Sequence, residues 1–209
     1  MRRVTAIITE YGRKGSWQKS LSMIQEMRLQ KLHPNIFTYS AAISACEKGG
    51  QWQVSYSLLA AMQQDQLEPD VVAYSAVISA CSRCRHWRQA SYLLGEMQRR
   101  SHDPDDFAYS ITMTAYASSR KWQGAMHIIS GLQAKERPPS AMVCNAAVSA
   151  CSWGAQWALA WALLRKACAG CLRLDTKLWN TTVGACEKGR QWRRAVEMLG
   201  EMRREGLQP

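Results

Sequence analysis

Apolar residues recur along this chain at the spacing of amphipathic helices, in short stretches separated by polar breaks. Tyr39, Ile43 and Cys46 form one such set, and their i, i+4, i+7 spacing places them on one face of a helix. After a glycine-containing break, a second set starts at Trp52 and ends before Pro69. Because the residue before proline is biased away from the helical conformation, the second helix is expected to end there. The pattern therefore predicts a helix hairpin.

The hairpin pattern repeats along the whole chain. The stretch TYSAAISACEKGGQW returns in altered form, and tryptophans mark a period of 35 at positions 17, 52, 87, 122, 157 and 192. A fixed period of this length indicates stacked repeats, and stacked helix hairpins form an α-solenoid. We therefore predict an all-α fold, a single solenoid with a right-handed superhelix and no second domain. Its six helix-turn-helix repeats are residues 1–35, 36–70, 71–105, 106–140, 141–175 and 176–209.

Composition narrows the class of partner. Lys and Arg number 27 against 16 Asp and Glu, a net charge of +11, which favours an acidic partner such as a nucleic acid or an anionic membrane. The most apolar run, residues 157–164, is shorter than the roughly 20 residues that span a bilayer. We therefore expect no membrane association, and no signal or targeting peptide is visible in the chain.

The cysteine positions indicate packing in the core rather than metal binding or catalysis. Four of them occupy the eleventh place of a repeat, where other repeats have tyrosine: Cys46, Cys81, Cys151 and Cys186. A place that accepts either residue is an apolar packing site, and free thiols favour a reducing compartment. The two C-x-x-C pairs lie more than eighty residues apart, whereas a structural zinc site needs four close ligands. Since no nucleophile–base pair or deaminase motif is present either, we expect no metal, no cofactor and no enzyme.

A second stripe runs along each first helix at the second, fifth, ninth and thirteenth places. In the second repeat it reads Phe37, Ser40, Ser44 and Lys48. Stacking of the repeats would align these positions into a groove with apolar surfaces, small polar tips and a basic edge. Single-stranded nucleic acid needs these three features, for base stacking, for hydrogen bonds to base edges and for phosphate neutralisation.

The 35-residue unit resembles a pentatricopeptide repeat of the P type, and the resemblance covers the whole chain. Its marks are Tyr followed by Asn, Ser or Thr near the start and Pro-Asp or Pro-Asn at the close. The related tetratricopeptide repeat has its tryptophan early in the first helix, whereas here the tryptophan opens the second. The ACEKG and GQW segments resemble algal and dinoflagellate members, which implies a chloroplast or mitochondrial location.

The resemblance implies that the chain binds single-stranded RNA, one base per repeat, through the fifth and the final residue of each repeat. The base-reading residues would be Thr5, Asn35, Ser40, Asp70, Ser75, Asp105, Ser110, Ser140, Asn145, Asp175 and Asn180. In the family's code a Thr–Asn pair reads adenine, Ser–Asp guanine and Asn–Asp uracil. The Ser–Ser pair of the fourth repeat has no assignment, and the Asn of the sixth favours a pyrimidine. The implied target is A-G-G-N-U-Y.

The resemblance also assigns stacking and phosphate contacts. Second-place residues would sandwich the bases: Arg2, Phe37, Val72, Phe107, Met142 and Lys177. Thirteenth-place cations would meet phosphates: Arg13, Lys48, Arg83 and Lys188. The fourth and fifth repeats depart from this pattern with Ser118 and Trp153, and the fifth also has Cys144 in place of tyrosine. Trp153 stands outside the 35-residue series and is a candidate for base stacking.

Each of these features has a structural alternative. The final residues are favoured helix N-cap types, and the small fifth-place residues could serve close packing of neighbouring helices. The six periodic tryptophans are expected in the core.

At the level of function, the leading hypothesis is a monomeric RNA-binding protein of organellar RNA processing, stability or translation, with protein partners in RNA metabolism. The alternative is a helical-repeat scaffold for protein–protein interaction.

Overall fold

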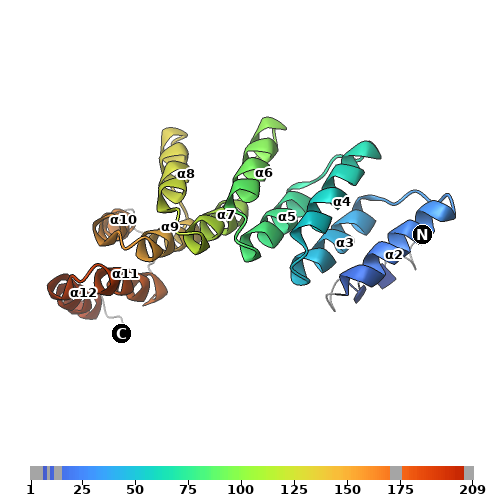
Figure 1. Ribbon diagram of the computed structural model, residues 1–209. Coiled ribbons are helices and arrows are strands. Elements are labelled where there is room, and N and C mark those ends of the chain that lie inside the picture. Colours follow the sequence, from blue (N-terminus) through green and yellow to red (C-terminus); the bar gives the residue numbers. More distant parts are fainter. Residues whose placement is uncertain (1–6, 9, 12–15, 170–175, 205–209) are drawn as a thin grey trace. The chain divides into compact units, whose positions relative to one another are not determined.

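The computed structural model describes residues 7–8, 10–11, 16–169 and 176–204. Within these ranges the chain is all helical and has no strand (Figure 1). The first helices of the second to sixth repeats are α3 (Ile36–Lys48), α5 (Val71–Arg83), α7 (Asp106–Ser118), α9 (Ala141–Trp153) and α11 (Thr176–Lys188). The second helices, which begin at the periodic tryptophans, are α2 (Trp17–Leu29), α4 (Trp52–Gln64), α6 (Trp87–Arg99), α8 (Trp122–Ala134), α10 (Trp157–Ala169) and α12 (Trp192–Arg204). The predicted all-α array of helix hairpins is confirmed.

The turns inside the hairpins have a conformation that the sequence pattern did not reveal. At the fifteenth place of the second to sixth repeats the backbone is left-handed, with φ of 66° at Gly50 and 60° at Arg85. A left-handed residue just after a helix lets the next N–H reach back to a helix carbonyl, as Gln51 N does to Cys46 O at 2.9 Å. Glycine suits this conformation, yet Arg120, Ala155 and other non-glycine residues adopt it.

The helices pack into two compact parts, residues 1–108 and 109–209. In the first part, α3 packs against α2, α4 and α5, and α5 packs against α4 and α6. In the second part, α9 packs against α8, α10 and α11, and α11 packs against α10 and α12. The first helices α3, α5, α9 and α11 thus each touch their own second helix and the first helix of a neighbouring repeat, which is the packing of a repeat array.

The fourth, eighth and eleventh places form the core, as predicted. Tyr39, Ile43 and Cys46 are fully buried in α3, and the same places are buried in α5. Burial raises the pKa of the Cys81 thiol to about 12 and that of Cys151 to about 11, because the thiolate is disfavoured away from water. These thiols are therefore neutral packing groups at physiological pH.

Five of the six periodic tryptophans are half-buried rather than placed in the core, and Trp192 is exposed, which corrects the expectation. An added Cβ at Gly49 would lie 2.4 Å from Cδ1 of Trp17, and one at Gly154 would lie 2.4 Å from Cδ1 of Trp122. The tryptophan at the start of one second helix therefore closes onto the glycine just after the next repeat's first helix. The 35-residue period thus marks a contact between neighbouring repeats.

The fourth-place tyrosines add a polar link between repeats. The Tyr39 hydroxyl donates to Oδ2 of Asp65 and accepts from Nη2 of Arg28 at 2.8 Å, so it joins α2 of the first repeat to the end of α4. The pKa of Tyr39 is raised mainly by burial of the hydroxyl and also by its hydrogen bond to Asp65. In the third repeat, Tyr74 donates to Glu96 and accepts from Gln63, both at 3.3 Å. We call this arrangement the tyrosine clasp.

Candidate nucleic-acid interface

The second stripe lies on the surface of α3 and α5, the two neighbouring first helices of the N-terminal part. At the second place, Phe37 is 75% exposed and Val72 is 66% exposed, unusually high values for large apolar side chains. At the thirteenth place, Lys48 and Arg83 are exposed at the ends of the same helices. Each helix therefore presents an apolar group near its start and a cation at its end.

Between these ends, the fifth-place serines have hydroxyls that lack a partner. The Oγ atoms of Ser40 and Ser75 are buried from water and make no hydrogen bond within the described part of the chain. Leaving a buried hydroxyl unsatisfied costs about 1–3 kcal/mol, so native structures rarely do it without a reason. Alanine would pack as well without this cost. The structure therefore disfavours close packing as the explanation of these serines and leaves two polar groups for a ligand.

The final residues of the repeats act as helix N-caps, as the structural alternative predicted. Oδ1 of Asp70 accepts from Ala73 N at 2.8 Å, and Oδ1 of Asp105 accepts from Ala108 N at 2.8 Å. Asn35 caps α3 in the same way, at 2.9 Å. Each of these caps uses one side-chain oxygen, and a carboxylate has a second one. Capping and base reading are therefore compatible roles for Asp70 and Asp105.

A carboxylate that the sequence analysis overlooked ties α3 to α5 beside the basic edge. Oε1 of Glu47 accepts from Ser79 Oγ at 2.7 Å and lies 4.0 Å from Nε of Arg83. An ion pair at this distance with one exposed partner contributes little to stability, and the Arg83 side chain remains 59% exposed. The ninth-place serine of the stripe is thus a structural link between repeats.

The stripe continues in the C-terminal part on α9 and α11. Met142 is exposed at the second place of α9, and Asn145 is half-buried at the fifth. In α11 both Lys177 and Asn180 are exposed. On α7, Phe107 is exposed and Ser110 is buried. Ser140 caps α9 through a long bond of 3.5 Å, and Lys188 is exposed at the end of α11. Arg2, Thr5, Arg13 and Asp175 lie outside the described residues.

Two thirteenth-place side chains of the C-terminal part lie against each other. Nζ of Lys188 sits 4.4 Å from the centroid of the Trp153 ring and donates to Ser152 Oγ at 3.3 Å. Trp153 is nevertheless 53% exposed. Because the fifth repeat has Trp153 at this place, an aromatic ring at the end of α9 is paired with the cation at the end of α11.

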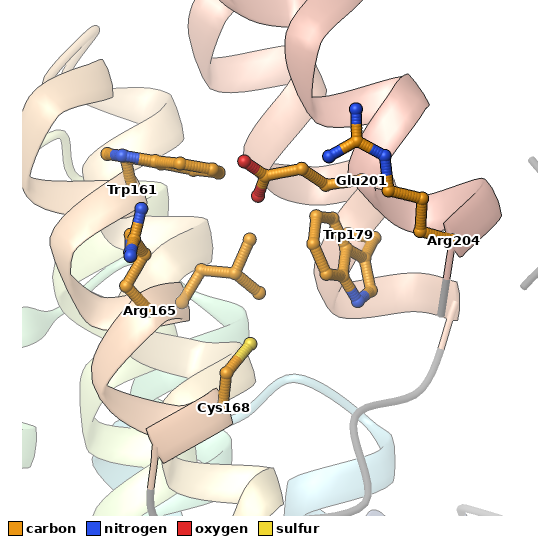
Figure 2. A pocket seen from close by; sticks show the side chains of 7 residues that line it. Trp161, Arg165, Cys168, Trp179, Glu201 and Arg204 are labelled. Atoms are coloured by element: carbon orange, nitrogen blue, oxygen red, sulfur yellow. The ribbon is translucent and has the colours of Figure 1, made fainter. Parts of the chain in front are cut away.

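Where the fourth-place tyrosine is replaced, a pocket occupies the position of the clasp. In the fifth repeat Cys144 lines a cavity of about 530 Å³ between α8, α9 and α10, together with Gln133 and Lys166. In the sixth repeat Trp179 lines a cavity of about 490 Å³ (Figure 2). The other lining residues of this second cavity are Trp161, Leu164, Arg165, Cys168, Glu201 and Arg204. In both of these repeats, the residue that replaces the fourth-place tyrosine therefore lines a cavity.

Two structural findings concern metal sites and membrane-spanning helices. Among the described residues, no three His, Cys, Asp or Glu side chains come together in a way that could hold a metal ion. Within the same ranges, no helix has the length and apolar character needed to cross a membrane.

Family models of one repeat class match most of the chain. The PPR repeat family matches residues 69–118, the pentatricopeptide repeat domain matches residues 3–49, and the PPR repeat matches residues 37–67 and 177–207. A comparison with curated proteins gives no match.

Solved structures of this class have the same fold. The pentatricopeptide repeat protein PPR10 from maize matches 99% of this chain at 26% identity and a TM-score of 0.75. This chain spans 30% of the length of that protein. The PPR domain of Arabidopsis thaliana protein-only RNase P 1, solved with tRNA, matches 87% of this chain and 96% of its own length at 10% identity and a TM-score of 0.71. With helices, packing and family models in agreement, the chain belongs to the pentatricopeptide repeat family.

Proposed function

We propose that this chain binds single-stranded RNA selectively, one base per repeat, along the stripe of its first helices. The observation that supports this best is the pair of buried, unpartnered hydroxyls of Ser40 and Ser75. They lie between exposed apolar groups and exposed cations on adjacent helices, an arrangement in which a base edge can supply the missing hydrogen bonds.

Related structures support RNA as the ligand. PPR10 has been solved in complex with an 18-nucleotide psaJ RNA element, and that structure matches the whole of this chain with a TM-score of 0.63. The Arabidopsis domain was solved with tRNA. These proteins share with this chain the hairpin array on which the stripe lies.

The geometry suggests how one repeat would read a base. Phe37 and Val72, at successive second places, would hold a base between them, while Ser40 and Asp70 meet its edge. Oδ1 of Asp70 is engaged in the cap, so its other oxygen would accept from guanine N–H groups. Ser75 and Asp105 would act in the same way in the third repeat, which gives the two guanines of A-G-G-N-U-Y.

The proposed cellular role depends only on the protein being bound to its RNA. An RNA-bound array blocks nucleases, opens structured RNA or recruits a protein partner, and it needs no catalytic group of its own. We propose that this protein acts in that way in the processing, stability or translation of organellar transcripts, in a chloroplast or mitochondrion.

The first test compares binding of A-G-G-N-U-Y and its complement by gel shift, with wild type and with Ser75→Ala. Wild type should prefer the first oligomer. Ser75→Ala should weaken its binding about 5- to 30-fold, since a hydrogen bond to a buried polar partner is lost, yet leave thermal stability equal or higher. Equal binding of both oligomers by wild type would contradict selective reading, and a co-purifying protein with no RNA binding would favour the scaffold alternative.

A reciprocal exchange tests the assignment of bases to repeats. Ser75→Asn combined with Asn145→Ser should turn the preferred target into A-G-U-N-G-Y, because the two repeats exchange their codes. Asparagine already occupies the equivalent place of α9, at Asn145, and thermal unfolding of the double variant checks that the fold is kept. The two oligomers have the same composition, so the charge of the RNA is constant. A preference that stays with A-G-G-N-U-Y would refute the assignments even where RNA binds.

A further inference from the structure

We propose that Trp153 and Lys188 form a stacking platform for one nucleobase of the bound strand, where a phosphate contact would otherwise lie. This inference rests on the proposed RNA-binding function and adds a contact of a different kind to it. Below, the platform means these two side chains.

The platform has a fixed geometry. Lys188 is anchored twice, by its place 4.4 Å over the Trp153 ring and by donation to Ser152 Oγ at 3.3 Å, and Ser152 itself is buried. A cation over an indole face is attracted by the ring quadrupole, which restrains both side chains. The 53% exposure of Trp153 is what remains with Lys188 already in place, so a large part of the indole is open to a ligand.

The platform lies in line with the proposed RNA path. Met142, Asn145, Ser149 and Trp153 occupy the second, fifth, ninth and thirteenth places of α9, which share one helix face. In α3 and α5 the last of these places holds the cations Lys48 and Arg83. A strand that follows the stripe therefore meets an aromatic face in the fifth repeat where it meets positive charge in the second and third.

The chemistry of the platform favours a nucleobase. A base stacked on an aromatic side chain contributes about 5- to 150-fold in affinity, the equivalent of about 1–3 kcal/mol, with little dependence on base identity. The Lys188 ammonium beside the ring adds charge for the phosphate of the same nucleotide. The platform would thus hold the strand in the fifth and sixth repeats without reading its sequence.

The test measures RNA affinity and its salt dependence for Trp153→Ala, Trp153→Phe and Lys188→Ala. The RNA is A-G-G-N-U-Y extended by two nucleotides at each end. Trp153→Ala should bind about 5- to 150-fold more weakly with an unchanged salt slope, and Trp153→Phe should retain most of the affinity. Lys188→Ala should reduce the slope by about 0.7, the value for one phosphate contact on a single strand. Stacking and charge are thereby separated.

An abasic scan identifies the stacked nucleotide. Each base of the oligomer is removed in turn, and one position should cost wild type the same factor as Trp153→Ala, while costing the Ala variant nothing further. Trp192→Ala is the matched control, because Trp192 is a tryptophan 68% exposed on α12, off the stripe, with Arg193 over its ring. This control should bind as wild type does.

The outcomes are distinguishable. If wild type binds RNA and Trp153→Ala binds equally well, the platform is refuted and the proposed function stands. If Trp153→Lys binds as tightly as wild type with a steeper slope, the place is a phosphate contact and the platform is again refuted. If wild type binds no RNA, the proposed function and the platform fall together. Thermal unfolding of each variant checks that the array is intact.

Discussion

At the scale of single residues, one side chain can hold the fold and serve the ligand at once. Asp70 illustrates this, because its Oδ1 caps α5 while its position at the close of the repeat makes it a candidate base reader. The fifth-place serines differ from Asp70, because their unpartnered hydroxyls lower the stability of the fold and can gain a hydrogen bond only from a ligand. Stability measurements can therefore separate the two classes of residue.

Replacing Asp70 by Asn or by Ala separates capping from base reading. Asp70→Asn should keep the stability within about 0.5 kcal/mol, because Asn35 makes the same cap in the second repeat, and should move the preferred base from guanine toward adenine. Asp70→Ala should lose about 1 kcal/mol of stability and the preference as well. Chemical denaturation and binding to oligomers varied at one base measure the two effects. An unchanged preference in Asp70→Asn would leave capping as the only role.

At the scale of helices, two of the contacts between neighbouring repeats depend on the size of a side chain: the tryptophan against the glycine of the next repeat, and the tyrosine clasp. Both join residues that belong to different repeats. Each depends on a residue of unusual size, since glycine admits the indole and tyrosine reaches across the seam. Substitutions that change only size should therefore act strongly at these places.

Gly154→Ala should destabilise the protein by about 1–3 kcal/mol, the usual cost of overpacking, because the new methyl group would lie 2.4 Å from Trp122. The matched control is Gly131→Ala in α8, where a Cβ would meet nothing within 4 Å. That change should stabilise by about 1 kcal/mol through helix propensity. Denaturant unfolding measures the free energy of unfolding of the two variants. Equal values would show that the Trp122 ring can move aside without cost.

Cys144→Tyr should raise stability by about 0.5–2 kcal/mol, the usual gain from filling a cavity. The new ring would enter the cavity of about 530 Å³ beside Gln133, which occupies the place that Gln63 holds when it donates to Tyr74. Cys144→Ala is the control and should lower stability, since it enlarges the cavity. A fall in melting temperature for Cys144→Tyr would show that a tyrosine side chain does not fit this cavity.

At the scale of the whole molecule, the question is whether RNA affinity comes from net charge or from a few placed cations. The chain has a net charge of +11, but the stripe carries only Arg13, Lys48, Arg83 and Lys188 at its thirteenth places. Glu47 lies beside Arg83 and places negative charge on the same edge. Local placement should therefore dominate over total charge.

Binding measured between about 50 and 200 mM salt should show a slope of log affinity against log salt near −3, since each contact on a single strand contributes about −0.7. If every unit of net charge took part, the slope would be about −8. Lys48→Gln should reduce the slope by about 0.7, whereas Lys166→Gln, on α10 and off the stripe, should not change it. A steep slope insensitive to Lys48 would mean non-specific attraction.

Much of the fold could be predicted from the sequence, for local reasons. Helix spacing, proline positions and N-cap types are properties of neighbouring residues, and the 35-residue period repeats them until the hairpins are unmistakable. The same periodicity separated a core face from a second stripe, so the candidate site was found as a set of equivalent places. Left-handed turns at Arg85 and similar residues were not predicted, because arginine carries no local signal for that conformation.

Tertiary structure decided what the side chains do across the seams between repeats. Only packing of α3 against α5 brings Glu47 to Ser79, and only packing of α9 against α11 places Lys188 over Trp153. The unpartnered state of the Ser40 and Ser75 hydroxyls also depends on which groups surround them in space. The sequence by itself determined the helices and the register of the repeats, because these follow from contacts within a few residues. Tertiary structure determined hydrogen bonding between repeats, exposure and pockets, because these depend on side chains that different helices bring together.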